Sequence, residues 1–368
     1  MNFCIGQPDF DTPNYIKQAA IKAIRDGKTG YTASPGIPEL RAAAAKYLSE
    51  TRKIDVEPES IVVANGAKPF IGYAILSVTD YGKGHEVLYP NPGFPIYESQ
   101  IAAHGAVPVP LPLLERKRYA FDTDNMESKI TEKTRLLILN SPHNPTGGVL
   151  GRKSLDQIAD IVKKHRNLWV FSDEVYSRMV HNGEFCSIAS IPEMQERTII
   201  VDGASKTYAM TGWRIGFSAN EKLAPYLSQW VTNTDSCAAH PNQYAALAAL
   251  TGPQDESRRM MFSFRKRRDF IVDGLNAILG VKCLKPGGAF YAWPNVTEAC
   301  GLVGATDSED FRKRLLHEAG VAVLSDIHFG HRNKGEGEHV RFSYATSEAS
   351  IKEGLRRIKD FIEQMKMR

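Results

Sequence analysis

Short runs rich in apolar residues recur through the first two thirds of the chain, each about the length of a buried strand. They stand at residues 61–64, 86–89, 136–139, 168–171, 198–201 and 214–217. Amphipathic stretches separate them: in residues 154–165, for example, Leu155, Ile158, Ala159 and Val162 recur at helical spacing. Apolar strands that alternate with helices are typical of a mainly parallel sheet covered by helices on both faces. The pattern therefore predicts an α/β fold.

The pattern changes after about residue 250. A long basic helical stretch covers 255–279. Three short apolar segments follow it, at 289–292, 321–324 and 340–343, and a final amphipathic stretch covers 347–365. This predicts a second, smaller α/β domain, and 368 residues fit two domains of roughly 150 residues each. We expect a large domain at 21–255 and a small domain built from 1–20 and 256–368, with the boundary in a helix because no linker-like segment is present.

The composition is that of a globular protein, with 42% hydrophobic residues, 24% charged residues and a net charge of +4. No apolar run approaches the roughly 20 residues of a membrane-spanning helix. The N-terminus lacks the basic region of a signal peptide, and the five cysteines form no C-x-x-C pair. We therefore expect a reduced, cytoplasmic protein without a membrane partner.

Two clusters of charged or metal-binding residue types need a separate interpretation. The basic run at 258–268 is interpreted as a solvated helix face and not as a nucleic-acid site, because the net charge is low and the run is confined to one helix. His328, His331 and His339 are interpreted as residues of a surface loop, since no carboxylate or cysteine falls at metal-ligand spacing. No metal site is predicted.

Polar residues follow four of the predicted strands, at the sheet edge where α/β proteins bind ligands. After 61–64 comes a small-residue turn that could bind an anion at a helix N-terminus. Asn144 follows 136–139, Asp173 follows 168–171, and Lys206 with Arg214 follows 198–201. Taken singly, each has an ordinary alternative: a rigid turn for Asn144, a helix cap for Asp173, a plain surface lysine for Lys206. Together they indicate a candidate Schiff-base site.

The sequence around these residues resembles the class I/II aminotransferases, the fold-type I enzymes that depend on pyridoxal 5′-phosphate, and in particular bacterial aspartate aminotransferases. Five blocks match the family in order and span essentially the whole chain: Gly6-Gln7-Pro8-Asp9-Phe10, Asn144-Pro145-Thr146-Gly147, Asp173-Glu174-Val175-Tyr176, the lysine block 205–216 and Arg341-Phe342-Ser343-Tyr344-Ala345. The resemblance implies a large domain with a mostly parallel mixed sheet flanked by helices, a smaller α/β domain, and ping-pong transfer of an amino group.

The resemblance also implies roles for individual residues. Lys206 would hold the cofactor as a Schiff base and then move the proton between the substrate Cα and the cofactor. Asp173 would face the ring nitrogen, and Asn144 and Tyr176 would hydrogen-bond the ring's phenolic oxygen. The phosphate would lie on Gly66, Ala67, Lys68, Ser205 and Arg214. Arg341 would bind the substrate α-carboxylate beside Gly6 and Asn144.

Three further residues are expected near the site by resemblance. Phe94 matches an aromatic residue that stacks on the cofactor ring, although a core aromatic is an equally good interpretation. Tyr31 matches a tyrosine that reaches the phosphate of the neighbouring subunit, which implies a homodimer with shared active sites. Lys68 matches a lysine that contacts a distal substrate carboxylate, which favours aspartate or glutamate as donor and 2-oxoglutarate or oxaloacetate as acceptor; aromatic or neutral donors stay open.

Other functions were weighed against this one. A nicotinamide oxidoreductase is disfavoured because no G-x-G-x-x-G follows a strand, and a P-loop enzyme because no G-x-x-x-x-G-K-[ST] is present. A non-catalytic binding protein with this fold would be expected to lack Lys206, Asp173 or Arg341. Within pyridoxal phosphate chemistry, a cysteine-conjugate β-lyase uses the same lysine and stays an alternative.

Overall fold

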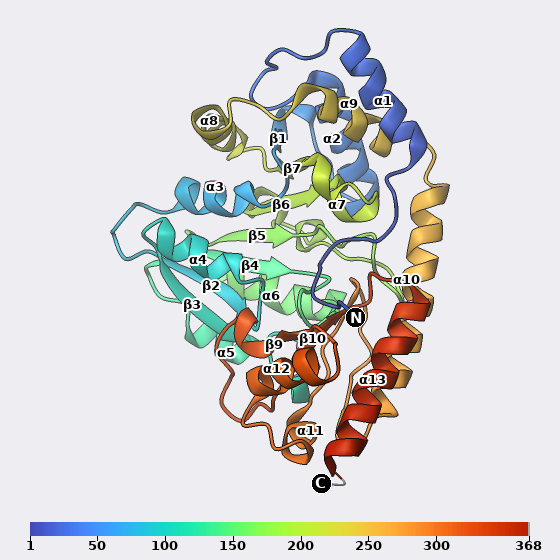
Figure 1. The fold of residues 1–368 in the computed structure, drawn as a ribbon. Helices are drawn as coiled ribbons and strands as arrows, with labels where there is room; N and C mark the ends of the chain where they lie inside the picture. The colour runs from blue at the N-terminus through green and yellow to red at the C-terminus, as the bar shows by residue number, and fades with distance from the viewer. Residues whose placement is uncertain (367–368) are drawn as a thin grey trace.

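The computed structural model describes residues 1–366 and contains a large sheet flanked by helices and a small sheet beside it (Figure 1). The strand order of the large sheet is β1-β7-β6-β5-β4-β2-β3. Strand β7 runs antiparallel to both of its neighbours, and the other neighbouring pairs are parallel. The predicted α/β fold with a mostly parallel mixed sheet is therefore confirmed. The strands are β1 (Ile61–Ala64), β2 (Glu86–Asn91), β3 (Val107–Pro112), β4 (Thr134–Asn140), β5 (Trp169–Asp173), β6 (Thr198–Gly203) and β7 (Gly216–Ala219).

The two faces of this sheet are buried under different helices. In β4, Leu136 and Ile138 belong to the apolar cluster that contains residues of α3, α4 and α8, whereas Leu137 and Leu139 belong to the cluster around α6. Alternate side chains of a strand point to opposite faces, so burial on both sides requires the continuous apolar runs seen in the sequence. The helices on these faces are α2 (Pro38–Arg52), α3 (Pro69–Val78), α4 (Ile96–Ala103), α5 (Thr123–Ser128), α6 (Arg152–Lys164), α8 (Ala224–Thr234) and α9 (His240–Thr251).

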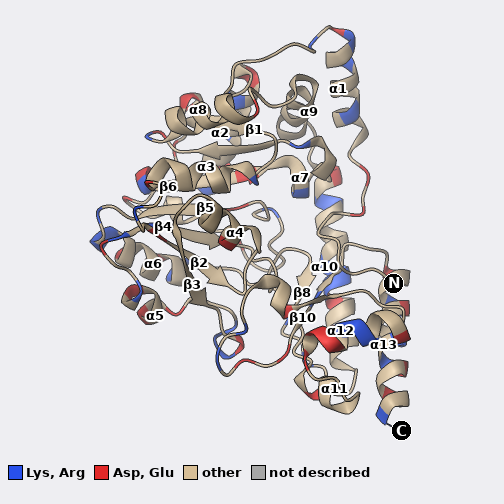
Figure 2. Cartoon of the chain, turned by 60° about the vertical axis from the view of Figure 1, so that its left-hand side comes forward, with Lys and Arg blue, Asp and Glu red and all other residues tan. Residues whose placement is uncertain are grey.

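The small sheet is antiparallel, in the order β8-β10-β9, and packs with the last three helices and α10. The N-terminal residues join it, because Phe3 donates its N–H to the Ala322 carbonyl and its own carbonyl accepts from Ser343 N–H. Acidic and basic residues both mark the outer helices α12 and α13 (Figure 2). The elements are α10 (Asp255–Asn276), β8 (Tyr291–Ala292), α11 (Thr297–Leu302), α12 (Ser308–Glu318), β9 (Leu324–Ser325), β10 (Val340–Ser343) and α13 (Glu348–Lys366).

Several predicted elements differ from those observed. Strand β3 was missed because prolines occupy alternate positions 108, 110 and 112; it is an edge strand, where the missing N–H groups can face away from β2. The strand predicted at 214–217 begins only at Gly216, since Arg214 has a left-handed backbone with φ 54°. The segment 289–292 forms a strand only at Tyr291–Ala292, and the strand predicted at 321–324 lies instead at Leu324–Ser325. The long helix ends at Asn276.

Two interpretations of charged residues are wrong in part. Arg267 and Arg268 of the basic run are buried and not solvated. Arg267 pairs with Asp9 at 2.6 Å, and Arg268 pairs with Asp269 at 2.8 Å. His339 is also buried, stacked on the Trp293 ring with centroids 5.6 Å apart. No helix among residues 1–366 is long and apolar enough to cross a membrane.

The division into domains stays a prediction, and the last two residues of the range 256–368 lie outside the described residues. Helix α1 (Asn14–Arg25) packs against α9 at one end of the large sheet (Figure 1), where Ile16 and Ala20 share an apolar cluster with Ala245 and Ala249. These contacts favour assigning residues 14–20 to the large domain. Residues 5–7, which precede this helix, line the pocket described next.

Candidate active site

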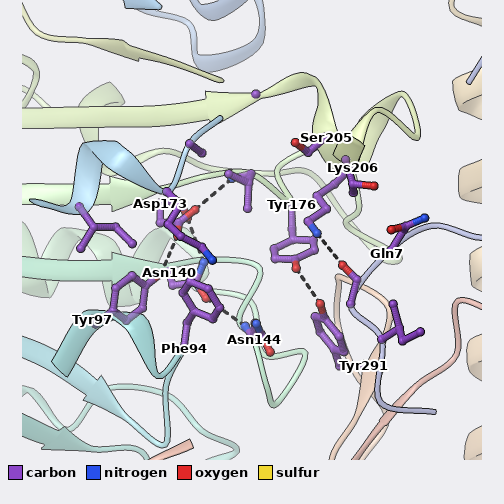
Figure 3. Close-up of a pocket in the computed structure, with 18 of the residues that line it drawn as sticks. Gln7, Phe94, Tyr97, Asn140, Asn144, Asp173, Tyr176, Ser205, Lys206 and Tyr291 are labelled. Atoms are coloured by element: carbon purple, nitrogen blue, oxygen red, sulfur yellow. Dashed lines mark hydrogen bonds between the residues drawn. The ribbon is translucent and has the colours of Figure 1, made fainter. Parts of the chain in front are cut away.

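A pocket of about 540 Å³ opens at the carboxyl ends of β4, β5 and β6 (Figure 3). The N-terminal segment lines it on one side, and β8 and β10 of the small sheet contribute to the wall. Eleven residues predicted for the site line it: Gly6, Ala67, Lys68, Phe94, Asn144, Asp173, Tyr176, Ser205, Lys206, Arg214 and Arg341. Residues far apart in the sequence therefore meet in one cavity.

Lys206 lies in a single helical turn, α7 (Ala204–Thr207), directly after β6. Its Nζ donates a hydrogen bond to the Gly6 carbonyl oxygen at 2.6 Å (Figure 3). Burial, together with the guanidinium groups of Arg214 and Arg341, lowers the pKa of this amine to about 8. A large neutral fraction is thus present near pH 8, as a nucleophile or proton acceptor requires.

Asp173 is the last residue of β5 and is buried. Tyr97 Oη donates a hydrogen bond to Asp173 Oδ2 at 2.6 Å, and the Val175 N–H approaches Oδ1 at 3.4 Å. Burial raises the pKa of this carboxyl to about 6, and the two hydrogen bonds oppose that rise. Within residues 1–366, no lysine, arginine or histidine nitrogen lies within 4.0 Å of it. A carboxylate held this way suits a cationic ligand group such as a protonated pyridine nitrogen.

The turn after β1 lies beside Arg214. Gly66 has φ 95°, and a Cβ there would lie 2.1 Å from Arg214 Nη2, so only glycine leaves the guanidinium in place. Arg214 in turn donates from Nη1 to the Thr211 carbonyl at 2.8 Å. Helix α3 begins directly after Lys68, and its N-terminus and the guanidinium approach the same side of the pocket. A helix N-terminus beside an arginine suits a phosphate group.

Arg341, in β10, is buried in the wall of the cavity. Its Nη1 donates to Asn144 Oδ1 at 2.8 Å, its Nη2 donates to the Cys4 carbonyl at 2.6 Å, and its Nε has no partner. The guanidinium carbon lies 4.4 Å from the centroid of the Tyr291 ring. A buried guanidinium N–H without a hydrogen-bond partner costs free energy, so this group suits a bound carboxylate.

Aromatic side chains form the remaining walls. Tyr176 Oη and Tyr291 Oη are hydrogen-bonded at 2.8 Å, and burial raises the pKa of Tyr176 well above its ordinary value. Phe94 faces the pocket and packs edge-on against Tyr97, with ring centroids 5.7 Å apart. Phe94 is only half-buried, which fits a ring exposed to a ligand better than a core aromatic.

Sequence reasoning missed several residues that line the pocket. Tyr97 and Asn140 contact Asp173, Tyr291 contacts Tyr176, and Gln7 and Thr211 lie at the edge. Asn140 could have been found, because it ends a predicted strand as Asp173 does. Tyr97 and Tyr291 could not, since their partners are far away in the sequence.

Two predicted residues stand outside the set that lines the pocket. Gly66 lies directly behind Arg214, where a Cβ would collide with the guanidinium. Tyr31 is 88% exposed and does not reach the pocket of its own chain. Its loop lies against the segment that contains Cys237, whose Sγ accepts from Thr32 N–H at 3.5 Å.

The charges of the pocket are unbalanced. Four basic side chains line it, and Asp173 is the one acidic side chain among the lining residues; the basic set is Lys68, Lys206, Arg214 and Arg341. The site is therefore built for a ligand set with several negative charges.

Comparison with known proteins places these features in a family. The model of the family described as aminotransferase class I and II matches residues 1–358. The asparagine–oxo-acid transaminase of Streptococcus mutans is 38% identical, covering 99% of this chain and 92% of the relative. The aspartate aminotransferase structure from Rhizobium meliloti superposes with a TM-score of 0.93 at 35% identity, covering 99% of this chain and 91% of that one. An aromatic aminotransferase structure from Pyrococcus horikoshii gives a TM-score of 0.93 at 36% identity, covering 100% and 97%.

Proposed function

The chain belongs to the class I and II aminotransferases, and from that premise we propose that it transfers the amino group of aspartate or glutamate to a 2-oxo acid such as 2-oxoglutarate. It is an enzyme of the fold-type I group and uses pyridoxal 5′-phosphate. The similar proteins act, by their names, on an amide, an acidic or an aromatic amino acid. The donor must therefore be argued from this chain's own pocket.

The pocket residues fit the cofactor. When bound, pyridoxal phosphate supplies an aldehyde that exchanges amines and a ring that accepts electrons from the substrate Cα. In our proposal Lys206 Nζ would hold the cofactor through its aldehyde carbon as a Schiff base, with water leaving. Asp173 would face the ring nitrogen, and Asn144 and Tyr176 would hydrogen-bond the phenolic oxygen. Arg214, Ser205 and the N–H groups of the turn at 66–68 would bind the phosphate.

Lys206 is also the proposed proton carrier. With a substrate amine in its place on the cofactor, Lys206 Nζ would be free to accept the proton from the substrate Cα and to donate it again. Burial and two neighbouring guanidinium groups lower the pKa of this amine to about 8, so a substantial neutral fraction is available at that pH.

The observation that carries the choice of donor is the charge count of the pocket. The phosphate dianion would be matched by Arg214 together with the N-terminus of α3, Arg341 by the α-carboxylate and Lys206 by its bond to the cofactor. This leaves Lys68 without an anion. No carboxylate of residues 1–366 lies within 4.0 Å of Lys68 Nζ, which instead lies 5.8 Å from the centroid of the Phe94 ring. A distal substrate carboxylate would fill this role with about 1.5–3 kcal/mol, or roughly tenfold to a hundredfold in kcat/KM.

The assembly we propose is a homodimer that shares its active sites. Tyr31 is exposed here, and its loop contacts the segment that contains Cys237, so these two stretches form one surface. A partner's Tyr31 would then reach the phosphate side of this pocket. We also propose a cytoplasmic location, since the five cysteines are all free.

A panel of amino donors tests the substrate proposal. Each donor is mixed with the holoenzyme without acceptor, and the change in cofactor absorbance gives a single-turnover kcat/KM. Aspartate or glutamate should exceed alanine, phenylalanine and asparagine, and Lys68→Met should lower the aspartate-to-alanine ratio tenfold to a hundredfold. The matched control is Lys153→Met, an exposed lysine outside the pocket.

Three results would contradict the proposal. An unchanged ratio in Lys68→Met would remove the distal role of this lysine. A preference for neutral or aromatic donors would overturn the donor assignment. Release of pyruvate and ammonia from a cysteine conjugate, without an acceptor and faster than amino transfer, would favour the β-lyase alternative.

A further inference from the structure

A buried arginine lies directly behind the candidate active site. Arg52 is the last residue of α2, and its side chain is 0% exposed. Its Nε donates to Glu174 Oε2 at 2.8 Å, and its Nη2 donates to Asp202 Oδ2 at 2.5 Å and to Ser177 Oγ at 2.8 Å. Its guanidinium carbon also lies 5.2 Å from the ring centroids of Tyr47 and Phe185.

Each partner of Arg52 adjoins a residue of the proposed machinery. Glu174 follows Asp173, Ser177 follows Tyr176, and Asp202 is the penultimate residue of β6, just before the turn that carries Lys206. One guanidinium therefore ties together the two strand ends that present these three groups. A shift of α2 would therefore move all three of these groups.

The carboxylates of the cluster are held by hydrogen bonds on every side. Glu174 Oε1 accepts from Ser172 Oγ at 2.8 Å and from Ser187 Oγ at 2.5 Å. Asp202 Oδ2 also accepts from Tyr47 Oη at 3.2 Å, and its Oδ1 accepts from the Gly203 N–H at 2.7 Å. Two carboxylates and one guanidinium leave a buried net charge of −1, which folding stability alone does not favour.

This charge acts on Asp173. The groups that face Asp173 are Tyr97 from α4, the Val175 N–H, Glu174 and Asp202, and Lys206 lies across the pocket. Glu174 and Asp202 raise the pKa of Asp173. The Arg52 guanidinium is paired with both of these carboxylates. Without it, two uncompensated carboxylates would favour the neutral form of Asp173.

We propose that Arg52 is a positioning residue, which orients the turns that carry Asp173, Tyr176 and Lys206 and keeps Asp173 charged opposite the cofactor ring. The inference rests on the role proposed above for Asp173. Arg52 lies far from its carboxylate partners in the sequence, since Arg52 and Glu174 are 122 residues apart.

Four variants distinguish an electrostatic effect of Arg52 on Asp173 from a purely structural role. Arg52→Met changes the cluster from −1 to −2, Arg52→Met/Glu174→Gln returns it to −1, and Glu174→Gln alone makes it neutral. Arg356→Met removes an exposed arginine of α13 and serves as the control. The readouts are the pH midpoint of the visible absorbance of the bound cofactor, the cofactor Kd and the thermal unfolding midpoint.

We expect the pH midpoint of the cofactor absorbance to rise as the net charge of the Arg52, Glu174 and Asp202 cluster becomes more negative. An ionised Asp173 keeps a positive charge on the ring nitrogen, and this charge lowers the pH at which the nearby Lys206-derived cation loses its proton. Arg52→Met should raise the midpoint by about one pH unit and weaken cofactor binding about tenfold. The double variant should return within a few tenths of wild type, and Glu174→Gln alone should shift it downward.

The outcomes decide between the proposals. If Arg52→Met and the double variant lose thermal stability but keep the wild-type midpoint, Arg52 is only structural and the inference is wrong. If Arg52→Met does not fold, the downward shift in Glu174→Gln supports the inference and an unchanged midpoint overturns it. If wild type itself shows no visible cofactor band, the proposed function fails instead.

Discussion

Replacing Tyr97 by phenylalanine removes the hydrogen bond that its hydroxyl donates to the Asp173 carboxylate, a contact of 2.6 Å. A hydrogen bond to a charged group is worth about 1.5–3 kcal/mol, and one pKa unit corresponds to about 1.4 kcal/mol. Burial has already raised the pKa of Asp173 to about 6, with the Tyr97 hydrogen bond opposing it. The variant should therefore raise this pKa by about one to two further units.

The assay is cofactor binding to apoenzyme as a function of pH. Protonation of Asp173 removes the anion that faces the ring nitrogen, so the Kd should rise as the pH falls through the pKa of this carboxyl. The wild-type curve should turn near pH 6, and the Tyr97→Phe curve should turn about one to two units higher. Phosphate and ring titrations affect both proteins, so the difference between the curves isolates Asp173.

Tyr89→Phe is the matched control, because Tyr89 is also a buried tyrosine but its carboxylate neighbour is Glu98. It should leave the turning point unchanged. If Tyr97→Phe binds the cofactor with the wild-type pH dependence, the assignment of Asp173 to the ring nitrogen is wrong.

Three further predictions follow from the same geometry. Gly66→Ala should weaken cofactor binding about tenfold to a hundredfold, because the new Cβ would lie 2.1 Å from Arg214 Nη2 and displace the guanidinium; wild-type affinity would refute the phosphate site. Mixing inactive Lys206→Ala with inactive Tyr31→Ala should restore activity through hybrid dimers, whereas no recovery despite subunit exchange would exclude a shared site. His181 is buried and its pKa is lowered to about 4, so the unfolded chain binds the extra proton first and stability falls as the pH drops from 6.5 towards 4. His181→Gln should remove roughly 3 kcal/mol of that loss in urea unfolding, and an unchanged pH slope would contradict the assignment.

The part of the site that the sequence could predict is the part that follows local rules. Asp173, Lys206 and the turn at 65–68 each follow an apolar strand, and parallel strands bring their carboxyl ends to one edge. Arg341 was found through the resemblance of its block, and it lies in a predicted strand. The α/β architecture could likewise be predicted, because strands buried on both faces must be apolar throughout.

The remaining features depend on contacts between distant segments. Tyr97 looks like a core aromatic until its hydroxyl is found on Asp173, 76 residues away. Arg52 ends a helix, where a basic residue is ordinarily explained by the helix dipole, and its two carboxylate partners are 122 and 150 residues away. Strand β3 was missed for another reason: prolines are tolerated only because it lies at the sheet edge, and no local pattern reveals that position.

The most direct test of the account is to locate the covalent bond between protein and cofactor. Holoenzyme is reduced with borohydride, digested, and analysed by peptide mass spectrometry. The account predicts that the mass of the reduced cofactor is found on the peptide that contains Lys206, and that Lys206→Ala shows no such modification. Attachment at another lysine, or no attachment at all, would contradict it.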